Sequence, residues 1–276
     1  MRAPVRHRRA PPVPSPAPAR SNHEALWNDA PFNTFATFMA RMRGPHSAAA
    51  NNVDALYHSL NVGLVHVIFL NAYCSQLRSY MVFPNACLAP GSAQAAWLKA
   101  DLAAVDRQLT PWTVVVEHAP YYNSASYHAN ATEGYIIQAA LEDQLHDVDI
   151  VIHGHVHTYE RSCRVVHGRC DTAGRAPAYI VLGDGGNREA VGGGGINNGP
   201  NGPQKAYPWL YPQPPWSMFR QGSFGHGIMT AVNATHLHWQ WRQAWVGAPD
   251  VGDDFWFVKG TSFGTCGDSV ERANFR

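Results

Sequence analysis

The sequence has few cysteines, little net charge and no long apolar run. Five cysteines in 276 residues are too few for a fold built on disulfides, so a hydrophobic core must hold it together. The formal net charge of +1 argues against nucleic acid as the main partner. The apolar run Val62 to Leu70 is interrupted by His66 and is far shorter than the roughly 20 residues of a membrane span. We therefore expect a soluble protein without a membrane segment.

Hydrophobic residues make up 45% of the chain and include nine Trp, which is enough for a substantial core. Residues 1–20 differ, with six Pro, five Arg and no acidic residue, so we expect a disordered tail there. A transit peptide or an anion-binding arm are alternatives, but the abrupt change at Ser21 favours an artefact in how the start was defined. We expect one globular domain over 21–259 and a tail over 260–276.

The cysteine spacing predicts one disulfide. Cys163 and Cys170 flank a segment that can turn back as a hairpin and could pair across it. Cys74 and Cys87 bracket another short loop, and Cys266 is the odd thiol. The alternative is that all five cysteines are reduced.

Two sequence triplets fit the pattern for N-glycosylation, at Asn130 and Asn233. Together with the expected disulfide they favour a secretory or extracellular setting. Residues 1–20 lack the apolar central region of a signal peptide, so no leader supports this setting directly.

Apolar periodicity predicts alternating helices and strands. Ser92 is expected to cap a helix whose apolar positions recur at spacings of four, three and four, which places them on one face. Such alternation implies βαβ units, and open α/β sheets bind ligands at the carboxyl ends of their strands. Helices are expected at 33–43, around Leu98, Leu102, Val105 and Leu109, and around Ile137, Leu141 and Leu145. Strands are expected at 62–70, 113–117, 148–152, 178–182, 228–233, 236–242 and 254–258.

The strand that ends near Ile152 leads directly into Gly154, His155, Val156 and His157. Glycine allows a sharp turn at the strand end, and two imidazoles one residue apart are typical zinc or iron ligands. Hydrogen-bonded loop histidines are the alternative for such a pair. His118 and Asp184 follow neighbouring predicted strands, so the polar residues of three strand ends are expected to share one edge of the sheet.

Four separated motifs occur in a characteristic order: Asn22-His23-Glu24, 115–118, 154–157, and 183–187 with 223–227 behind it. Their order resembles the purple acid phosphatases, a branch of the dinuclear metallophosphoesterases, whose later motifs read GNH(D/E), VxxH and GHxH. The resemblance runs from about 21 to about 259. It implies an α/β fold, a β-sandwich flanked by helices (α/β/β/α), and an acid phosphatase that hydrolyses phosphoric monoesters with a metal-activated hydroxide.

The resemblance also implies a set of metal ligands. Asn22, His118 and His155 match ligands of the divalent metal, which is Zn, Mn or Fe, and His157 matches a ligand of the first metal, usually Fe(III). Imidazole and amide oxygen suit a divalent ion of this kind, whereas Fe(III) prefers hard, charged ligands.

Other matching positions concern the substrate, a small phosphate ester. His23 is expected to contact the phosphate, His128 to hold or protonate the leaving alcohol, and Tyr127 to contact the substrate. No ligand role carries over to Asp184, for which a structural turn is expected, and His226 is expected to pack or hydrogen-bond near the same edge.

The family's earlier motifs, GDxG and GDxxY, do not occur in this sequence. We therefore expect a catalytic domain truncated at its N-terminus, in which the divalent site is the better preserved and the chain alone has weak or no phosphatase activity. Alternative functions are a phosphodiesterase or nucleotide pyrophosphatase of the same fold, and an inactive pseudoenzyme that binds at most one metal. Family resemblance places the protein outside the cell or in the vacuole. The sequence does not define an oligomeric state.

Overall fold

The computed structural model describes residues 57–73, 88–186, 198–199, 202–203, 208–244 and 251–260. The expected tail at 1–20 and the expected helix at 33–43 lie outside these residues, as do Asn22 and His23. Within the described part, no helix has the length and apolar character needed to cross a membrane.

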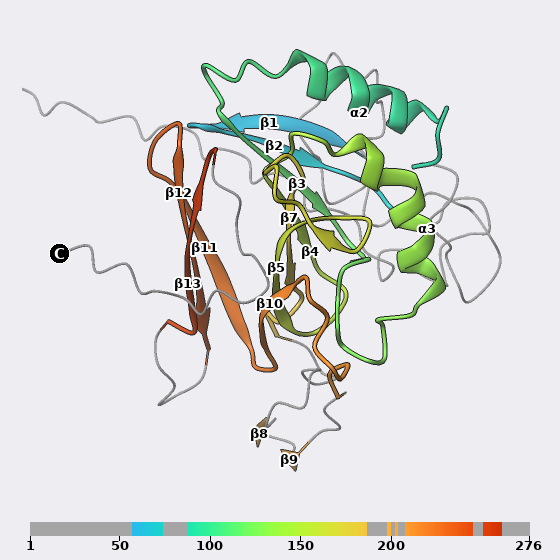
Figure 1. Ribbon diagram of the computed structural model, residues 1–276, viewed down its shortest axis with the longest axis vertical. Helices are drawn as coiled ribbons and strands as arrows, with labels where there is room; N and C mark the ends of the chain where they lie inside the picture. The colour runs from blue at the N-terminus through green and yellow to red at the C-terminus, as the bar shows by residue number, and fades with distance from the viewer. Residues whose placement is uncertain are drawn as a thin grey trace, which may run out of the picture.

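The larger sheet has eight strands and lies in the middle of the molecule (Figure 1). Its central strands β2, β3, β4 and β7 run parallel to one another, whereas the strands at both edges are antiparallel. The order is β1 (His58–Val62), β2 (Val65–Phe69), β3 (Trp112–Glu117), β4 (Ile150–His153), β7 (Ala178–Leu182), β5 (Tyr159–Val166) and β10 (Ser217–Gln221), and β6 (Arg169–Cys170) pairs with β5.

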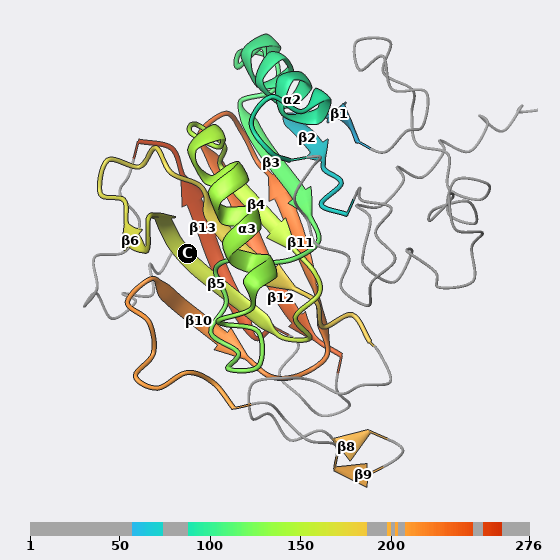
Figure 2. The same ribbon diagram turned by 90° about the vertical axis from the view of Figure 1, so that its right-hand side faces the viewer.

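A smaller antiparallel sheet covers one face of the larger sheet, and the α-helices cover the other (Figure 2). Both described α-helices lie on the same side, so the described part has an α/β/β arrangement within the mixed α/β fold that the sequence predicts. The remaining elements are α2 (Ala93–Ala104), α3 (Thr132–Leu141), the 3-10 helix η3 (Glu142–Gln144), β11 (Gly225–Ala231), β12 (His236–Gln243), β13 (Asp253–Val258), and the short pair β8 (Asn198–Gly199) and β9 (Gly202–Pro203).

Successive side chains of a strand point to opposite faces, and the central strands bury both. In β3, Val115 packs in the core beneath the helices, whereas Trp112 and Val114 pack in the core between the two sheets. Strands buried on both faces read as continuous apolar runs. The strand expected at 113–117 is present as β3 and begins one residue earlier, at Trp112.

Two of the expected elements differ from the structure in an informative way. The run 62–70 is not one strand, because a turn at Gly63 (φ 55°) separates β1 from β2. The helix capped by Ser92, whose hydroxyl accepts from Ala95 N at 3.1 Å, ends at Ala104 rather than near Thr110.

Asp106 explains the early end of that helix. Its side chain accepts from Gln108 N at 2.9 Å and its carbonyl from Thr110 N at 2.8 Å, which closes a turn away from the helix axis. Leu109 is consequently 68% exposed and does not share the buried helix face with Leu98.

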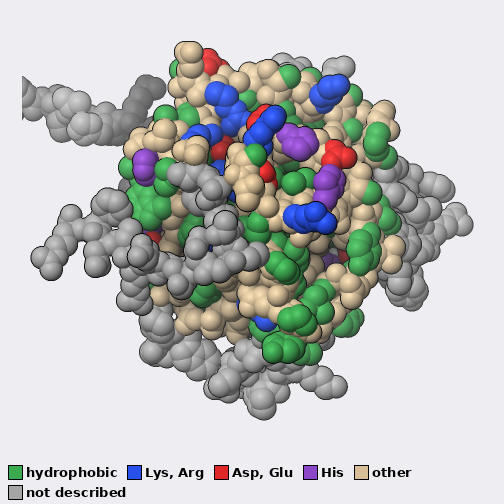
Figure 3. Space-filling model, in the orientation of Figure 1, with side chains coloured by type: hydrophobic (Ala, Val, Ile, Leu, Met, Phe, Trp, Pro, Cys, Tyr) green, Lys and Arg blue, Asp and Glu red, His purple; other side chains and the backbone are tan. Residues whose placement is uncertain are grey.

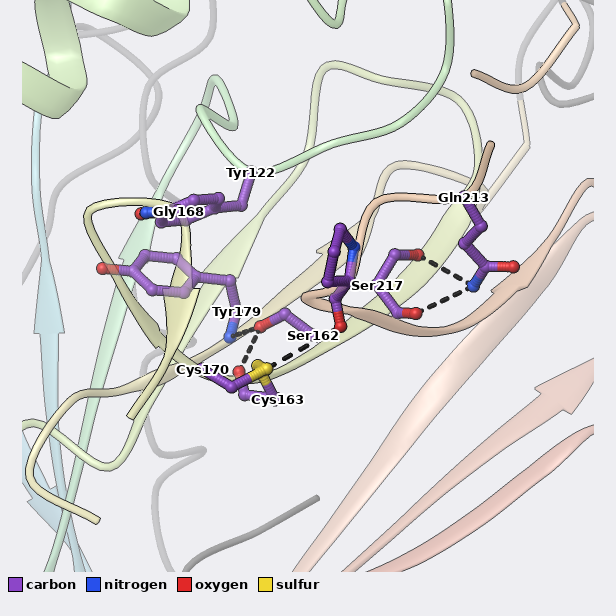
Figure 4. The surroundings of a disulfide bond; sticks show 9 residues. Tyr122, Ser162, Cys163, Gly168, Cys170, Tyr179, Gln213 and Ser217 are labelled. Carbon is purple, nitrogen blue, oxygen red and sulfur yellow. Dashed lines mark hydrogen bonds between the residues drawn. A yellow bond between two sulfur atoms is a disulfide. The ribbon is translucent and has the colours of Figure 1, made fainter. Parts of the chain in front are cut away.

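The expected disulfide between Cys163 and Cys170 is present and joins β5 to β6, with a Cα–Cα distance of 5.8 Å (Figure 4). Cys74, Cys87 and Cys266 lie outside the described residues. Both candidate glycosylation residues, Asn130 and Asn233, are exposed.

A buried polar cluster joins the two sheets. The Arg161 guanidinium of β5 donates to both carboxylate oxygens of Asp253 in β13, at 2.7 and 3.1 Å. The Tyr159 hydroxyl donates to the same carboxylate at 2.6 Å and accepts from the Trp239 indole at 2.8 Å. All four side chains are buried, so each polar group is satisfied inside the sandwich.

Asp184 also joins the sheets, a structural role that the sequence did not predict. Its carboxylate is buried and accepts from the Trp241 indole at 2.8 Å, while its carbonyl accepts from Gly225 N at 3.0 Å. Burial raises the pKa of Asp184 from 3.8 to about 6. His226, in contrast, is exposed on β11 opposite Arg242.

Replacing Asp253 with alanine should destabilise the protein strongly, because the Arg161 charge stays buried without its bidentate partner. We expect the free energy of unfolding, measured by urea denaturation, to fall by about 3–5 kcal/mol. Asp254→Ala is the matched control, since the neighbouring Asp254 is exposed and pairs with His238 at the surface, and it should cost at most about 1 kcal/mol. Equal losses in both variants would contradict the structural role of the buried pair.

Asp184 should make the protein less stable as the pH rises. A carboxyl whose pKa is raised in the folded state holds its proton when the unfolded chain has lost it, so stability falls between about pH 4 and pH 6. At about pH 7 the loss reaches at most about 3 kcal/mol. Asp184→Asn removes this term, so the stability difference between variant and parent should grow in favour of the variant over that pH range. A difference independent of pH would exclude the assignment.

Candidate metal centre

His118 and His155 meet at the carboxyl ends of two neighbouring parallel strands. His118 follows β3 directly, and His155 stands two residues beyond β4. Their imidazole centroids are 5.0 Å apart with an interplanar angle of 64°. Gly154 N donates to His118 O at 2.9 Å, so a backbone hydrogen bond also joins the two turns that carry the rings.

The turn after β4 is tight, and its shape explains why residue 183, which lies against it, is glycine. His155 has a positive φ of 59°, and Val156 N donates to Gly154 O at 2.6 Å. The turn lies against the end of β7, where a Cβ on Gly183 would stand 2.1 Å from Val156 O. Only glycine at this position allows such a close approach of the two backbones.

A third histidine comes from the loop before α3. The His128 ring lies 4.8 Å from the His155 ring and 4.8 Å from the ring of Tyr127, which is 65% exposed. This loop is anchored by a β-bridge between Ala125 and Trp209. The structure therefore brings together His118, His128 and His155, which the sequence selected from three separate segments.

Glu133 and Tyr73 are close to the histidines and were not predicted. Glu133 Oε2 lies 3.5 Å from His155 Nε2, and the Tyr73 hydroxyl donates to the other oxygen of the same carboxylate. The Tyr73 ring lies 5.6 Å from the His118 ring. Burial raises the pKa of Glu133 to about 7. An acid in the first turn of a helix is usually read as favourable for the helix, so the sequence offered no separate signal.

The histidines at the strand ends suit a divalent metal, although they do not complete its ligand set. Bonds from zinc to imidazole nitrogen are about 2.0–2.1 Å, and two rings as close as those of His118 and His155 can reach one ion. Within the described residues, no group of three or more His, Cys, Asp and Glu side chains is placed to hold a metal. His157 is half-buried in the same turn. The third expected ligand, Asn22, lies outside the described part.

Charged side chains of both signs gather on the upper part of the face in Figure 3. One groove, of about 360 Å³, has Arg107, Asp149, Arg164 and Lys259 among its lining residues. Asp149 precedes β4, at the opposite end of that strand from His155, and accepts from Lys259 Nζ at 2.9 Å and from Thr113 N at 2.8 Å. This groove is therefore separate from the histidines.

Family models identify the class of protein that this fold and these strand-end histidines define. Residues 11–159 match the model described as Calcineurin-like phosphoesterase, which covers His118 and His155. Residues 176–254 match the model described as Iron/zinc purple acid phosphatase-like protein C.

Curated relatives identify the family within this class of protein. The chain is 38% identical to Purple acid phosphatase 18 of Arabidopsis thaliana over 86% of its own length and 48% of the relative. It is 34% identical to Purple acid phosphatase 1 of Ipomoea batatas, over 82% of this chain and 44% of that one. The Fe(3+)-Zn(2+) purple acid phosphatase 12 of Arabidopsis thaliana is 32% identical, over 81% and 44%. The chain belongs to the purple acid phosphatase family of the calcineurin-like phosphoesterases.

A solved structure supports the fold. Purple acid phosphatase PPD1 from yellow lupin (Lupinus luteus) seeds superimposes with a TM-score of 0.56 at 21% identity, over 74% of this chain and 33% of that one. The chain spans about half the length of the curated relatives it matches. Family names also support iron and zinc as the metals of the family.

Replacing Gly183 with alanine should disturb the turn that carries His155 and His157, because the new methyl group would collide with the carbonyl of Val156. Overpacking of this kind costs about 1–3 kcal/mol, so we expect a lower melting temperature and shifted NMR signals of the His155 ring. Gly185→Ala is the matched control, since no atom lies within 4 Å of a Cβ there, and both readings should stay unchanged. An unperturbed Gly183→Ala protein would contradict the close approach.

Proposed function

We propose that this site belongs to a metal-dependent acid phosphatase that hydrolyses phosphoric monoesters. The observation that carries the proposal is the meeting of His118 and His155 at adjacent strand ends, 5.0 Å apart, in a chain of the purple acid phosphatase family. Both would hold the divalent metal, together with Asn22. The chemistry that a dinuclear centre supplies is a Lewis acid for phosphate oxygens and an activated water.

Glu133 supports a ligand role for His155. Its carboxylate faces Nε2 of His155 at 3.5 Å, and we assign Nδ1 as the nitrogen that would bind the metal. Carboxylates commonly orient metal-binding histidines in this way and fix the tautomer. The Tyr73 hydroxyl in turn holds Glu133.

The substrate would lie where His128 faces His155. The His128 ring is half-buried, and Tyr127 beside it is exposed. His128 can therefore donate a proton to the leaving oxygen while Tyr127 contacts the organic group. His23 is proposed to contact the phosphate. His157 is proposed as a ligand of the first metal, Fe(III). We also propose that the divalent site, to which Asn22, His118 and His155 are assigned, is the better preserved of the two.

The monoesterase is preferred to a phosphodiesterase of the same fold because the matched relatives are named acid phosphatases. We further propose a secreted or extracellular location. The Cys163–Cys170 disulfide is of the kind that persists in oxidising compartments, and Asn130 and Asn233 are exposed for glycosylation.

The proposal is tested by metal binding and catalysis on the full chain. We expect a divalent ion to bind, and slow metal-dependent hydrolysis of an aryl phosphate monoester at acidic pH to exceed that of the corresponding diester. His118→Ala/His155→Ala should abolish both binding and hydrolysis. His146→Ala, which removes an exposed histidine elsewhere, should change neither. Metal binding that survives the double substitution would overturn the ligand assignment.

A further inference from the structure

Glu117 and His153 form a buried pair directly beneath the two metal-ligand histidines. They are the last residues of β3 and β4 and stand opposite each other in the parallel register. His153 Nδ1 lies 2.5 Å from Glu117 Oε1, and both side chains have 0% exposure. The candidate metal ligands follow this pair closely. His118 is one residue beyond Glu117, and His155 is two residues beyond His153.

The pair is connected to both ligand-bearing turns. The second carboxylate oxygen of Glu117 accepts from Ala119 N at 3.1 Å, so the backbone is held on both sides of His118. On the other strand, His153 precedes Gly154, whose N–H donates to His118 O. The contact between Glu117 and His153 and the backbone hydrogen bond from Gly154 to His118 therefore define the spacing of the two turns.

Aromatic side chains hold the His153 ring in place. It stacks on Tyr179 of β7, with centroids 5.7 Å apart and an interplanar angle of 7°, and meets the edge of Tyr121 at 5.7 Å. The Tyr121 hydroxyl donates to the Tyr179 hydroxyl at 2.9 Å. Burial raises the pKa of Tyr121 well above its usual range, and the nearby Tyr179 and Glu117 raise it further.

Stability alone does not explain such a pair. Burying two ionisable side chains is costly, and replacing a complete buried pair of this kind with apolar side chains is often neutral or stabilising. The neighbouring positions of β3 and β4 are apolar, so an apolar pair would continue the same core. The two polar residues instead stand at the one level of these strands that adjoins the candidate ligands.

We propose that Glu117 and His153 are positioning residues that fix the separation and orientation of the His118 and His155 imidazoles. The proposal rests on the proposed function only in taking those imidazoles as metal ligands. Neither Glu117 nor His153 contacts the metal in this assignment. Their effect is transmitted through Ala119 and Gly154.

The test replaces the whole pair, as Glu117→Leu/His153→Leu, in the full chain. We expect the unfolding midpoint to change little, because no single charge is left buried, whereas Co²⁺ and Zn²⁺ affinity should fall about 10–100-fold and the Co²⁺ absorption spectrum should change. In the metal-free protein, the nuclear Overhauser effect between ring protons of His118 and His155 should weaken. Thr113→Val is the control, because it removes a buried hydroxyl from the opposite end of β3 and should leave metal affinity, the Co²⁺ spectrum and the ring contact unchanged.

A second variant decides the matter if the double substitution prevents folding. Glu117→Gln leaves one acceptor oxygen where the carboxylate has two, so one of the contacts with His153 and Ala119 is lost and metal affinity should fall about tenfold. Metal affinity and ring contact equal to those of the parent, in whichever variant folds, would overturn the positioning role. If the parent binds no divalent metal, the proposed function fails, and the ring contact of the metal-free protein still tests the positioning role.

Discussion

The parallel register between β3 and β4 is the constraint on which the candidate centre depends. It places Glu117 opposite His153 and therefore His118 beside the turn that carries His155. Both strands are buried on both faces, and a slip of one residue would exchange the side chains of the two cores. The hydrophobic pattern that folds the sheet thus also fixes the distance between the two imidazoles.

The two sheets are joined by polar contacts as well as by apolar packing. The carboxylates of Asp253 and Asp184 each accept a hydrogen bond from an aromatic side chain of the sandwich, and Asp253 also pairs with Arg161. Asp184 follows β7 immediately after Gly183, the residue on which the His155 turn rests. The contact between the sheets and the shape of the candidate centre therefore share one short segment of chain.

Strand positions and the histidines at strand ends could be predicted because they depend on local patterns. The runs at 114–116 and 178–182 are apolar, and a histidine or a glycine follows the last residue of each strand. The prediction that Leu109 lies on the buried face of a helix is wrong. Its spacing continues the helical period, but the turn formed by Asp106 leads the chain away from the helix. Glu133 and Tyr73 could not be found in this way, since their meeting depends on packing between segments 60 residues apart.

The proposed ligand residues and the proposed substrate residues differ in how they are held. His118 and His155 stand at the ends of buried strands, whose register leaves them little freedom, and Glu117 with His153 adds a second tie between those strands. His128 and Tyr127 belong to a loop that is pinned by the bridge from Ala125 to Trp209 and by the hydrogen bond from Leu210 N to Ser124 O. Loops tolerate sequence change better than buried strands. Selectivity for the organic group of a phosphate ester can therefore vary in this loop without moving the imidazoles that would bind the metal.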